Sequence, residues 1–242
     1  ARPEFVAPWP DHAHVTRIDL KRLDGELGEL LMGNVTGNKH LPKGVVGQIL
    51  ARADGVPLFI EELTRTVMES ELLIETDAGY ELAGPLPALA IPTTLHASLL
   101  ARLDRLGTVR DVAQIGAALG REFSFDMLRR VSRLDTARLT AALDQLIAAG
   151  LIFARGAPPD AHYQFKHVLL RDAAYAGMLR GRRAEMHAAI ATALVAELPE
   201  MAESEPETLA HHLAEAGRTE EAARHWLRAG GIAARRSANL EA

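Results

Sequence analysis

Leucines at helical spacing, interrupted at short intervals by glycine or proline, run through most of this chain. The clearest set is Leu95, Leu99, Leu103 and Leu106, which would share one face of a helix. Alanine and leucine are abundant and are strong helix formers, whereas aromatic residues make up only 5% of the chain. We therefore expect a mostly α-helical protein built from short helices with little β-structure.

Composition excludes several classes of protein. The 242 residues include no cysteine, which rules out disulfides and cysteine-ligated metal sites. The formal net charge of -5 argues against broad nucleic-acid binding, which needs clustered lysine and arginine. No apolar run approaches the ~20 residues of a membrane span, and no secretory signal pattern is present. We expect a cytoplasmic protein with no membrane contact.

The first predicted domain, residues 1–85, contains three short helices and a hairpin. The second and third helices begin at Pro42 and Pro57, because proline fits the first turn of a helix. The third helix is expected to end near Ser70. The other expected features are a strand over 15–20, an N-cap at Asp24, an apolar helix face of Leu27, Leu30 and Leu31, and a hairpin over 72–82.

The second predicted domain, residues 86–178, has several helices followed by two strands. The segment Phe123-Ser124-Phe125 is expected to start a helix with Ser124 as its cap, and Asp135 is expected to cap the next one. The strands are expected over 151–154 and 162–165, joined by a segment rich in turn residues. Helices followed by a two-stranded wing are typical of a winged-helix domain.

A helical connector is expected over 179–202 and the start of a repeat region over 203–242. The acidic segment Glu197–Glu207 holds two prolines and is interpreted as a solvated linker. The spacing of Gly217, Ala222, Trp226 and Ala229 resembles that of a tetratricopeptide repeat, in which small residues let paired helices approach and a large aromatic residue fills the gap.

The first motif covers residues 55–63, GVPLFIEEL. Gly55 allows a tight approach of the backbone, and Pro57 can start a helix while its ring faces a neighbour. A glycine followed closely by a proline also has a purely structural interpretation: one helix ends and the next helix begins with proline. The whole string resembles the G-N-P-L-F-L-E-E-L element of STAND-class signalling NTPases, AAA-like proteins found fused to class III adenylate or guanylate cyclases and to transcription regulators.

The second motif covers residues 165–175, FKHVLLRDAAY. It places His167 where a wing strand should enter a helix, and an imidazole there can donate to a phosphate beside the helix amides. A histidine that simply covers a domain edge is the alternative. The string resembles F-R-H-A-L-I-R-D-A-A-Y of the same NTPases and the Met-His-Asp motif of plant resistance and apoptotic switch proteins. Arg171 and Asp172 are expected to form a structural pair.

The resemblance implies a nucleotide-sensing role for three residues. Pro57 would pack near the base of bound ADP or ATP, with Gly55 as backbone support, and His167 would contact the β-phosphate of ADP in a closed state. Val168 replaces the acid of the Met-His-Asp motif, so only the histidine carries over. The chain would be the C-terminal part of a longer signal-transduction ATPase, whose NTPase core lies upstream and whose repeats bind protein partners.

The phosphate-binding machinery of such an ATPase is absent from the sequence. Residues 33–39, GNVTGNK, have the wrong spacing for a P-loop and no Ser or Thr after Lys39. No apolar strand ends in paired acids that could hold magnesium, and no cyclase domain is visible. We therefore expect no catalytic residues and no ATP hydrolysis by this chain alone, with Mg²⁺ bound only in the complete parent.

No metal site is expected either. His12 and His14 lack further ligands, and adjacent His211 and His212 should point to different faces of a helix.

Two other functions stay open. A winged-helix DNA-binding regulator would read DNA with residues 135–149, which offer Arg138 but also Asp144. A helical scaffold without any nucleotide role is the third possibility.

Overall fold

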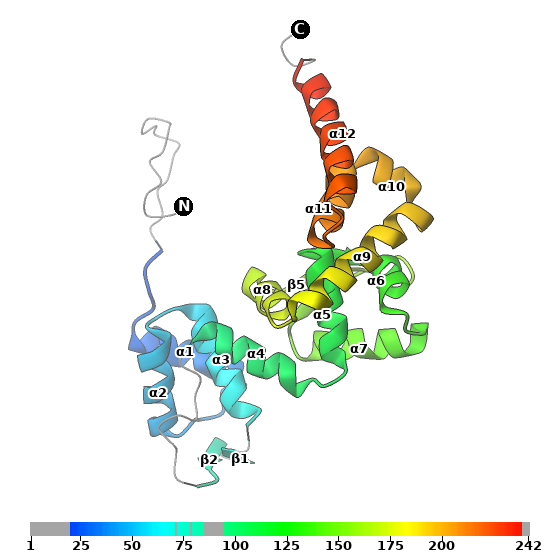
Figure 1. The fold of residues 1–242 in the computed structure, drawn as a ribbon. Coiled ribbons are helices and arrows are strands. Elements are labelled where there is room, and N and C mark those ends of the chain that lie inside the picture. The colour runs from blue at the N-terminus through cyan, green and yellow to red at the C-terminus, as the bar shows by residue number, and fades with distance from the viewer. Residues whose placement is uncertain (1–19, 71, 78, 85–93, 239–242) are drawn as a thin grey trace, which may run out of the picture. The chain divides into compact units, whose positions relative to one another are not determined.

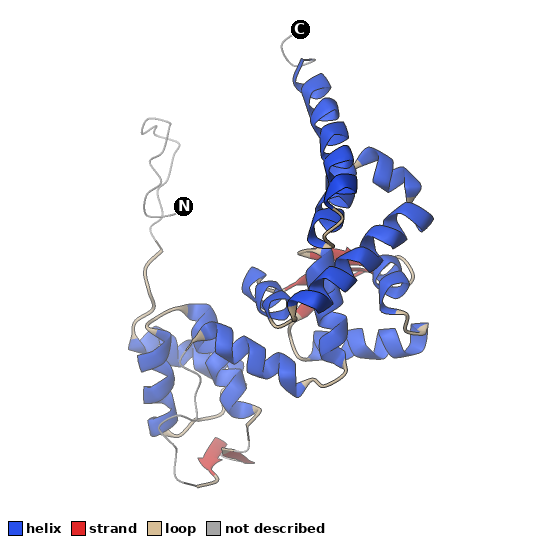
Figure 2. Ribbon diagram, viewed as in Figure 1, coloured by secondary structure: helices blue, strands red, loops and turns tan. Residues whose placement is uncertain are grey.

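The computed structural model describes residues 20–70, 72–77, 79–84 and 94–238. These residues form twelve helices and five short strands (Figures 1 and 2), so the prediction of a mostly α-helical protein is confirmed. The chain divides into two compact units, Ala1–Thr93 and Thr94–Ala242. His12, His14 and residues 15–19 of the strand expected over 15–20 lie outside the described residues.

Three helices and a hairpin make up the first unit. Asp24 caps the first helix by accepting a hydrogen bond from the Leu27 amide at 2.9 Å, as predicted. The hairpin strands pair antiparallel with Leu73 opposite Leu82. The elements are α1 (Gly25–Val35), α2 (Lys43–Ala53), α3 (Pro57–Met68), β1 (Leu73–Thr76) and β2 (Gly79–Leu82).

The predicted inward face of α1 is wrong. Leu27 and Leu30 are 49% and 66% exposed, whereas Gly28 and Met32 are buried. A Cβ at position 28 would lie only 2.5 Å from Leu50 Cδ2. The helix therefore turns its smallest residue toward its neighbours, which brings the backbones close and leaves two leucines on the outside.

The second unit holds the remaining helices and a three-stranded sheet. Its first half comprises α4 (Leu95–Arg105), α5 (Val109–Leu119), β3 (Glu122–Ser124), α6 (Phe125–Ser132), α7 (Thr136–Ala148), β4 (Ile152–Arg155) and β5 (His162–Phe165). Its second half comprises α8 (Val168–Ala176), α9 (Arg180–Glu197), α10 (Pro199–Ser204), α11 (Pro206–Glu215) and α12 (Thr219–Ala238).

Helix α5 lies at the centre of this unit. It contacts α6, α7, α8, α9 and β3. Close packing from several sides is possible because half of its buried positions are small. Its buried residues are Val109, Val112, Ala113, Gln114, Ile115, Gly116, Ala117 and Ala118.

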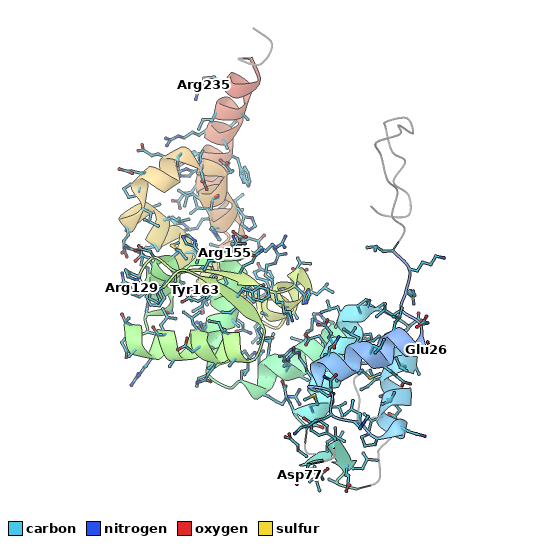
Figure 3. All side chains as sticks on the ribbon, turned by 180° about the vertical axis from the view of Figure 1, so that it is seen from behind. Glu26, Asp77, Arg129, Arg155, Tyr163 and Arg235 are labelled. Atoms are coloured by element: carbon cyan, nitrogen blue, oxygen red, sulfur yellow. The ribbon has the colours of Figure 1, made fainter. Side chains whose placement is uncertain are left out.

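The sheet has the strand order β3-β5-β4, with both pairs antiparallel. Ser124 caps α6 by accepting from the Met127 amide, as predicted, but Phe123, which was expected at the helix start, lies in the strand Glu122–Ser124. Phe123 stacks on Tyr163 of β5, with ring centroids 5.9 Å apart. Tyr163 is almost fully buried and is labelled in Figure 3. Cross-strand pairing, which local sequence does not encode, therefore fixes β3.

The interpretation of Glu197–Glu207 as a linker is wrong. This segment contains the short helix α10 and the start of α11, and prolines occupy their first turns.

Helices α11 and α12 form a hairpin around Gly217, which has a φ of 77°. Trp226, expected to fill the gap within the hairpin, is 47% exposed. Within the described residues, no helix is both long and apolar enough to cross a membrane.

The contact between α5 and β3 predicts the outcome of adding one methyl group. A Cβ at Gly116 would lie 2.7 Å from the ring of Phe123, so Gly116→Ala should destabilise the protein by about 1–3 kcal/mol, although alanine favours helix. Gly181 in α9 has no neighbour in that direction, and Gly181→Ala should be neutral or stabilising by about 1 kcal/mol. Urea unfolding measures both, and equal effects would contradict this packing.

Candidate functional site

Gly55 and Pro57 join α2 to α3 in the first unit. Gly55 has a φ of 68°, and a Cβ there would collide with the carbonyl oxygen of Leu23. The amide of Leu23 donates to the Gly55 carbonyl at 2.8 Å, so this glycine binds the segment before α1 to the α2–α3 turn. Pro57 is the first residue of α3 and is exposed. Its ring is therefore free to meet a ligand or another domain.

Residues 33–39 complete the C-terminal end of α1. Thr36 is the C-cap, and its Oγ1 donates to the carbonyl oxygens of Gly33 at 3.2 Å and Lys39 at 2.7 Å. Gly37 and Asn38 both have positive φ values. The glycines thus end a helix, whereas the glycines of a P-loop follow a strand.

His167 lies where β5 ends and α8 begins. It is the N-cap of α8 with extended backbone angles, and its side chain makes no capping hydrogen bond. Its Nε2 is buried and has no hydrogen-bond partner among the described residues. The expected position at a helix start is confirmed, and this ring nitrogen is not committed to a structural contact. Arg171 and Asp172, one turn further on, form the predicted pair, with Nε donating to Oδ1 at 3.0 Å.

A histidine cluster that the sequence analysis missed lies between α9 and α11. It consists of His187, His211 and His212, each of which offers a ring nitrogen, and these atoms lie within 4.8 Å of one another. His187 and His212 are buried and His211 is exposed. The cluster lines a cavity of about 650 Å³ in the second unit. Other residues around this cavity are Arg171, Asp172, Tyr175, Glu207, Glu215 and Trp226.

Hydrogen bonds connect the cluster to α8. The Tyr175 hydroxyl donates to Glu215 Oε2 at 3.3 Å and lies 2.9 Å from His187 Nε2. The hydroxyl has one proton, and it is donated to Glu215. In the contact between the hydroxyl and His187, the proton is therefore on His187 Nε2, which donates to the hydroxyl oxygen. His187 Nδ1 is then the acceptor of the 2.8 Å contact with His212 Nδ1, and His212 is the donor.

Burial sets the charge of this network. Burial and the nearby His187 and His211 lower the pKa of His212 to about 3. Burial and His211 also lower the pKa of His187, against a smaller opposing effect of Glu215. Burial and Glu215 raise the pKa of Tyr175. Both buried imidazoles are therefore neutral near pH 7, which is the form of histidine that can bind a metal ion.

His211 and His212 were not expected to act together as metal ligands, but the fold adds His187 as a third nearby histidine. They do leave α11 in different directions, but His187 of α9 lies within reach of both, with ring centroids 5.7 Å and 5.0 Å away. His187 precedes them by more than twenty residues, so no local spacing motif reveals the cluster. The cluster forms because α9 and α11 contact each other in the fold.

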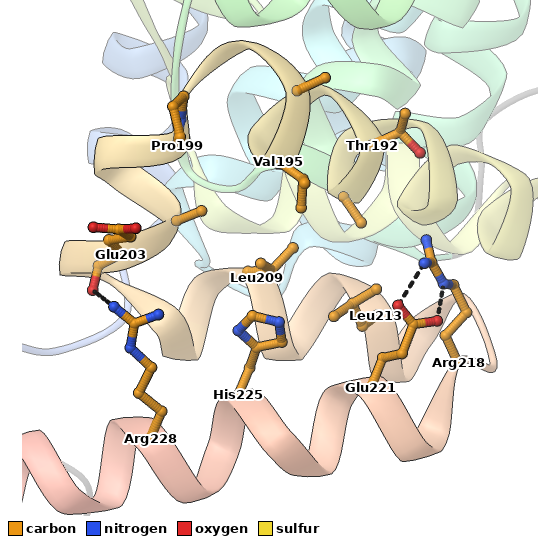
Figure 4. Close-up of a pocket in the computed structure, with 13 residues that line it drawn as sticks. Thr192, Val195, Pro199, Glu203, Leu209, Leu213, Arg218, Glu221, His225 and Arg228 are labelled. Atoms are coloured by element: carbon orange, nitrogen blue, oxygen red, sulfur yellow. Dashed lines mark hydrogen bonds and ion pairs between the residues drawn. The ribbon is translucent and has the colours of Figure 1, made fainter.

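A second cavity, of about 480 Å³, lies among α9, α10, α11 and α12 (Figure 4). Arg218 donates to both carboxylate oxygens of Glu221, at 2.7 Å and 2.6 Å. Arg228 reaches the carbonyl oxygen of Glu203 at 3.4 Å. His225 Nδ1 is buried without a hydrogen-bond partner in the described part of the chain. Arg218 and Arg228 are already paired within the protein, so they are less available to bind a ligand than the ring nitrogens of the histidine cluster are.

The chain is similar to an uncharacterized protein of Rhizobium meliloti (strain 1021). The two are 30% identical over 247 residues, a match that covers all of this chain and 23% of that protein. The chain thus spans about a quarter of the length of this relative. No protein-family model matches the chain.

The low pKa of His212 predicts a specific loss of stability in acid. The unfolded chain takes up a proton at this residue as pH falls through 6.5, while the folded pKa of about 3 keeps the ring neutral. Stability is therefore lost as pH falls below 6.5, and His212 contributes about 1–2 kcal/mol of this loss between pH 6.5 and 5. Urea unfolding with EDTA present should show a shallower pH dependence for His212→Gln. The exposed His96 supplies the control His96→Gln, and an equal pH dependence in all three proteins would contradict the assignment.

Proposed function

We propose that this chain is the nucleotide-sensing and protein-interaction part of a STAND-class signal-transduction NTPase, in which ADP stabilises a closed state. The observation that carries the proposal is the position of His167. It follows the last strand of a small sheet, begins α8, and leaves a ring nitrogen without a partner. Nε2 is enclosed, so a phosphate contact requires the ring to turn toward the start of α8, where free amides favour an anion.

The order of elements supports the same interpretation. From α5 to β5 the second unit runs helix, strand, helix, helix, strand, strand, which is the order of a winged-helix domain with β4 and β5 as its wing. The three-helix first unit suits a lid, and Pro57 at the exposed start of α3 suits a contact with the nucleotide base. The hairpin of α11 and α12 suits the start of a repeat region.

The proposed intramolecular partner is the NTPase core of the same polypeptide. Leu27 and Leu30 of α1 are exposed, as are Val168 and Leu169 in the first turn of α8. An NTPase core that bound the nucleotide beside His167 would also cover the apolar residues next to it. The similar protein from Rhizobium meliloti is long enough to hold such a core, because this chain covers only 23% of it.

Further repeats of the same polypeptide are the proposed occupants of the α12 surface. Trp226 and Leu227 are 47% and 79% exposed, and a next helical hairpin stacked on α12 would bury them. Protein partners would bind along such an array. We propose that ATP, Mg²⁺ and any hydrolysis belong to the core, and that an adenylate or guanylate cyclase domain is the output domain of the parent.

The alternative of DNA binding receives less support. The exposed positions of α7 include Arg138, but its guanidinium lies 3.4 Å from the carboxylate of Asp135. The other exposed residues of α7 include Asp144 and Ile147. A helix that reads the major groove needs several exposed polar or basic side chains and supporting phosphate contacts.

The proposal predicts that His167→Ala weakens ADP binding by the full-length gene product. Loss of one charge-assisted hydrogen bond to phosphate corresponds to about 10–100-fold in Kd. Fluorescent ADP titration measures this directly, and Pro57→Ala should also weaken binding. His162→Ala is the matched control, because His162 is an exposed histidine on β5 of the same wing.

Unchanged ADP affinity and release in both His167→Ala and Pro57→Ala would contradict the nucleotide role. The chain would then be a helical scaffold. Circular dichroism of each variant separates this result from a loss of folding.

A further inference from the structure

We infer that His187, His211 and His212 form a binding site for a divalent transition-metal ion of the zinc type. The three imidazoles come from two helices, α9 and α11, and converge on one cavity. This inference is independent of the nucleotide proposal, because it concerns a different part of the second unit and a different ligand.

The distance between the two buried rings suits a metal bridge after a small movement. His187 Nδ1 and His212 Nδ1 are 2.8 Å apart. Two nitrogens bound to tetrahedral zinc at about 2.0–2.1 Å lie about 3.3 Å from each other. An opening of about half an ångström would thus replace the shared hydrogen bond by two metal–nitrogen bonds.

The protons of the network permit this exchange. His187 Nδ1 carries no proton, because the proton of this ring is on Nε2, next to the Tyr175 hydroxyl, and its lone pair accepts only the hydrogen bond from His212. His212 carries its proton on Nδ1, and moving that proton to its own Nε2 through solvent frees the second lone pair without changing the charge of the ring. Tyr175 and Glu215 would then orient His187 as outer partners, a common arrangement around metal-bound histidine.

The third ligand leaves the site open to solvent. His211 is exposed, so its ring can turn toward the two buried nitrogens at little cost in packing. Three histidines and a cavity of about 650 Å³ leave room for a water molecule or a small ligand as the fourth partner, as in zinc sites with three protein ligands. Imidazole ligands without thiolate favour zinc, nickel, copper or cobalt over magnesium and calcium.

Charge around the cavity also favours a cation. Glu207 and Glu215 line it, whereas the lining residues Arg171 and Asp172 form an ion pair with each other. A bound ion would link α9 to α11. It would therefore hold the C-terminal hairpin against the body of the second unit, and would stabilise that contact in proportion to metal concentration.

The test is metal binding by this 242-residue chain after treatment with EDTA and without a histidine tag. Zinc titration against a chromophoric chelator should give one ion per chain. Cobalt should give the intense visible bands of a four-coordinate site. Because one of three ligands is removed, His211→Ala should weaken zinc binding by about tenfold or more while leaving the fold intact, and Tyr175→Phe should weaken it by about tenfold through the outer partner.

His96→Ala is the control, since His96 is an exposed histidine on α4, outside the cluster. It should bind zinc like the original chain. Equal losses in His96→Ala and His211→Ala would show adventitious binding to surface histidines and would overturn the inference. So would the absence of binding at micromolar zinc. His187→Gln and His212→Gln remove buried ligands, and their zinc affinities are compared only after circular dichroism shows that they fold.

Discussion

The second unit depends on the burial of helix α5. Eight of its eleven residues are buried, and it contacts five elements that follow it in the chain, β3, α6, α7, α8 and α9. Bulky side chains around the whole helix would keep these neighbours apart. Gly116 and the alanines at 113, 117 and 118 allow them to approach, so each neighbour is fixed relative to the others through one shared helix.

Both candidate sites inherit their geometry from this arrangement. Helix α8, whose N-cap is His167, packs on α5, and so does α9, which carries His187. The C-terminal end of α5, residues 117–120, lines the histidine cavity. A ligand at either site would therefore act on helices that share a core, which gives a physical route for the two sites to influence each other.

Local sequence predicted those features that depend on local interactions. Asp24, Ser124 and Asp135 each accept a hydrogen bond from an amide three residues later, as expected of residues with short polar side chains before apolar helices. The strands β4 and β5 were predicted from two short segments separated by turn residues, and the helix after β5 was predicted to start at His167.

Features that depend on long-range contacts were missed. The three residues of β3 are too short to show an alternating pattern, and they form a strand because β5 pairs with them. Leu27 and Leu30 mark an apolar face by spacing, but Gly28 packs inward because close helix contact outweighs side-chain burial there. The histidine cluster requires α9 and α11 to meet, and nothing in the spacing of its residues indicates that contact.

Our central proposal is that the start of α8 senses the nucleotide. Hydrogen–deuterium exchange on the full-length gene product, with and without ADP, tests it most directly. The account predicts that ADP slows exchange of the amides at Val168 and Leu169, with no such change in a protein carrying alanine at position 167. Exchange at these amides that is the same with and without saturating ADP would contradict it.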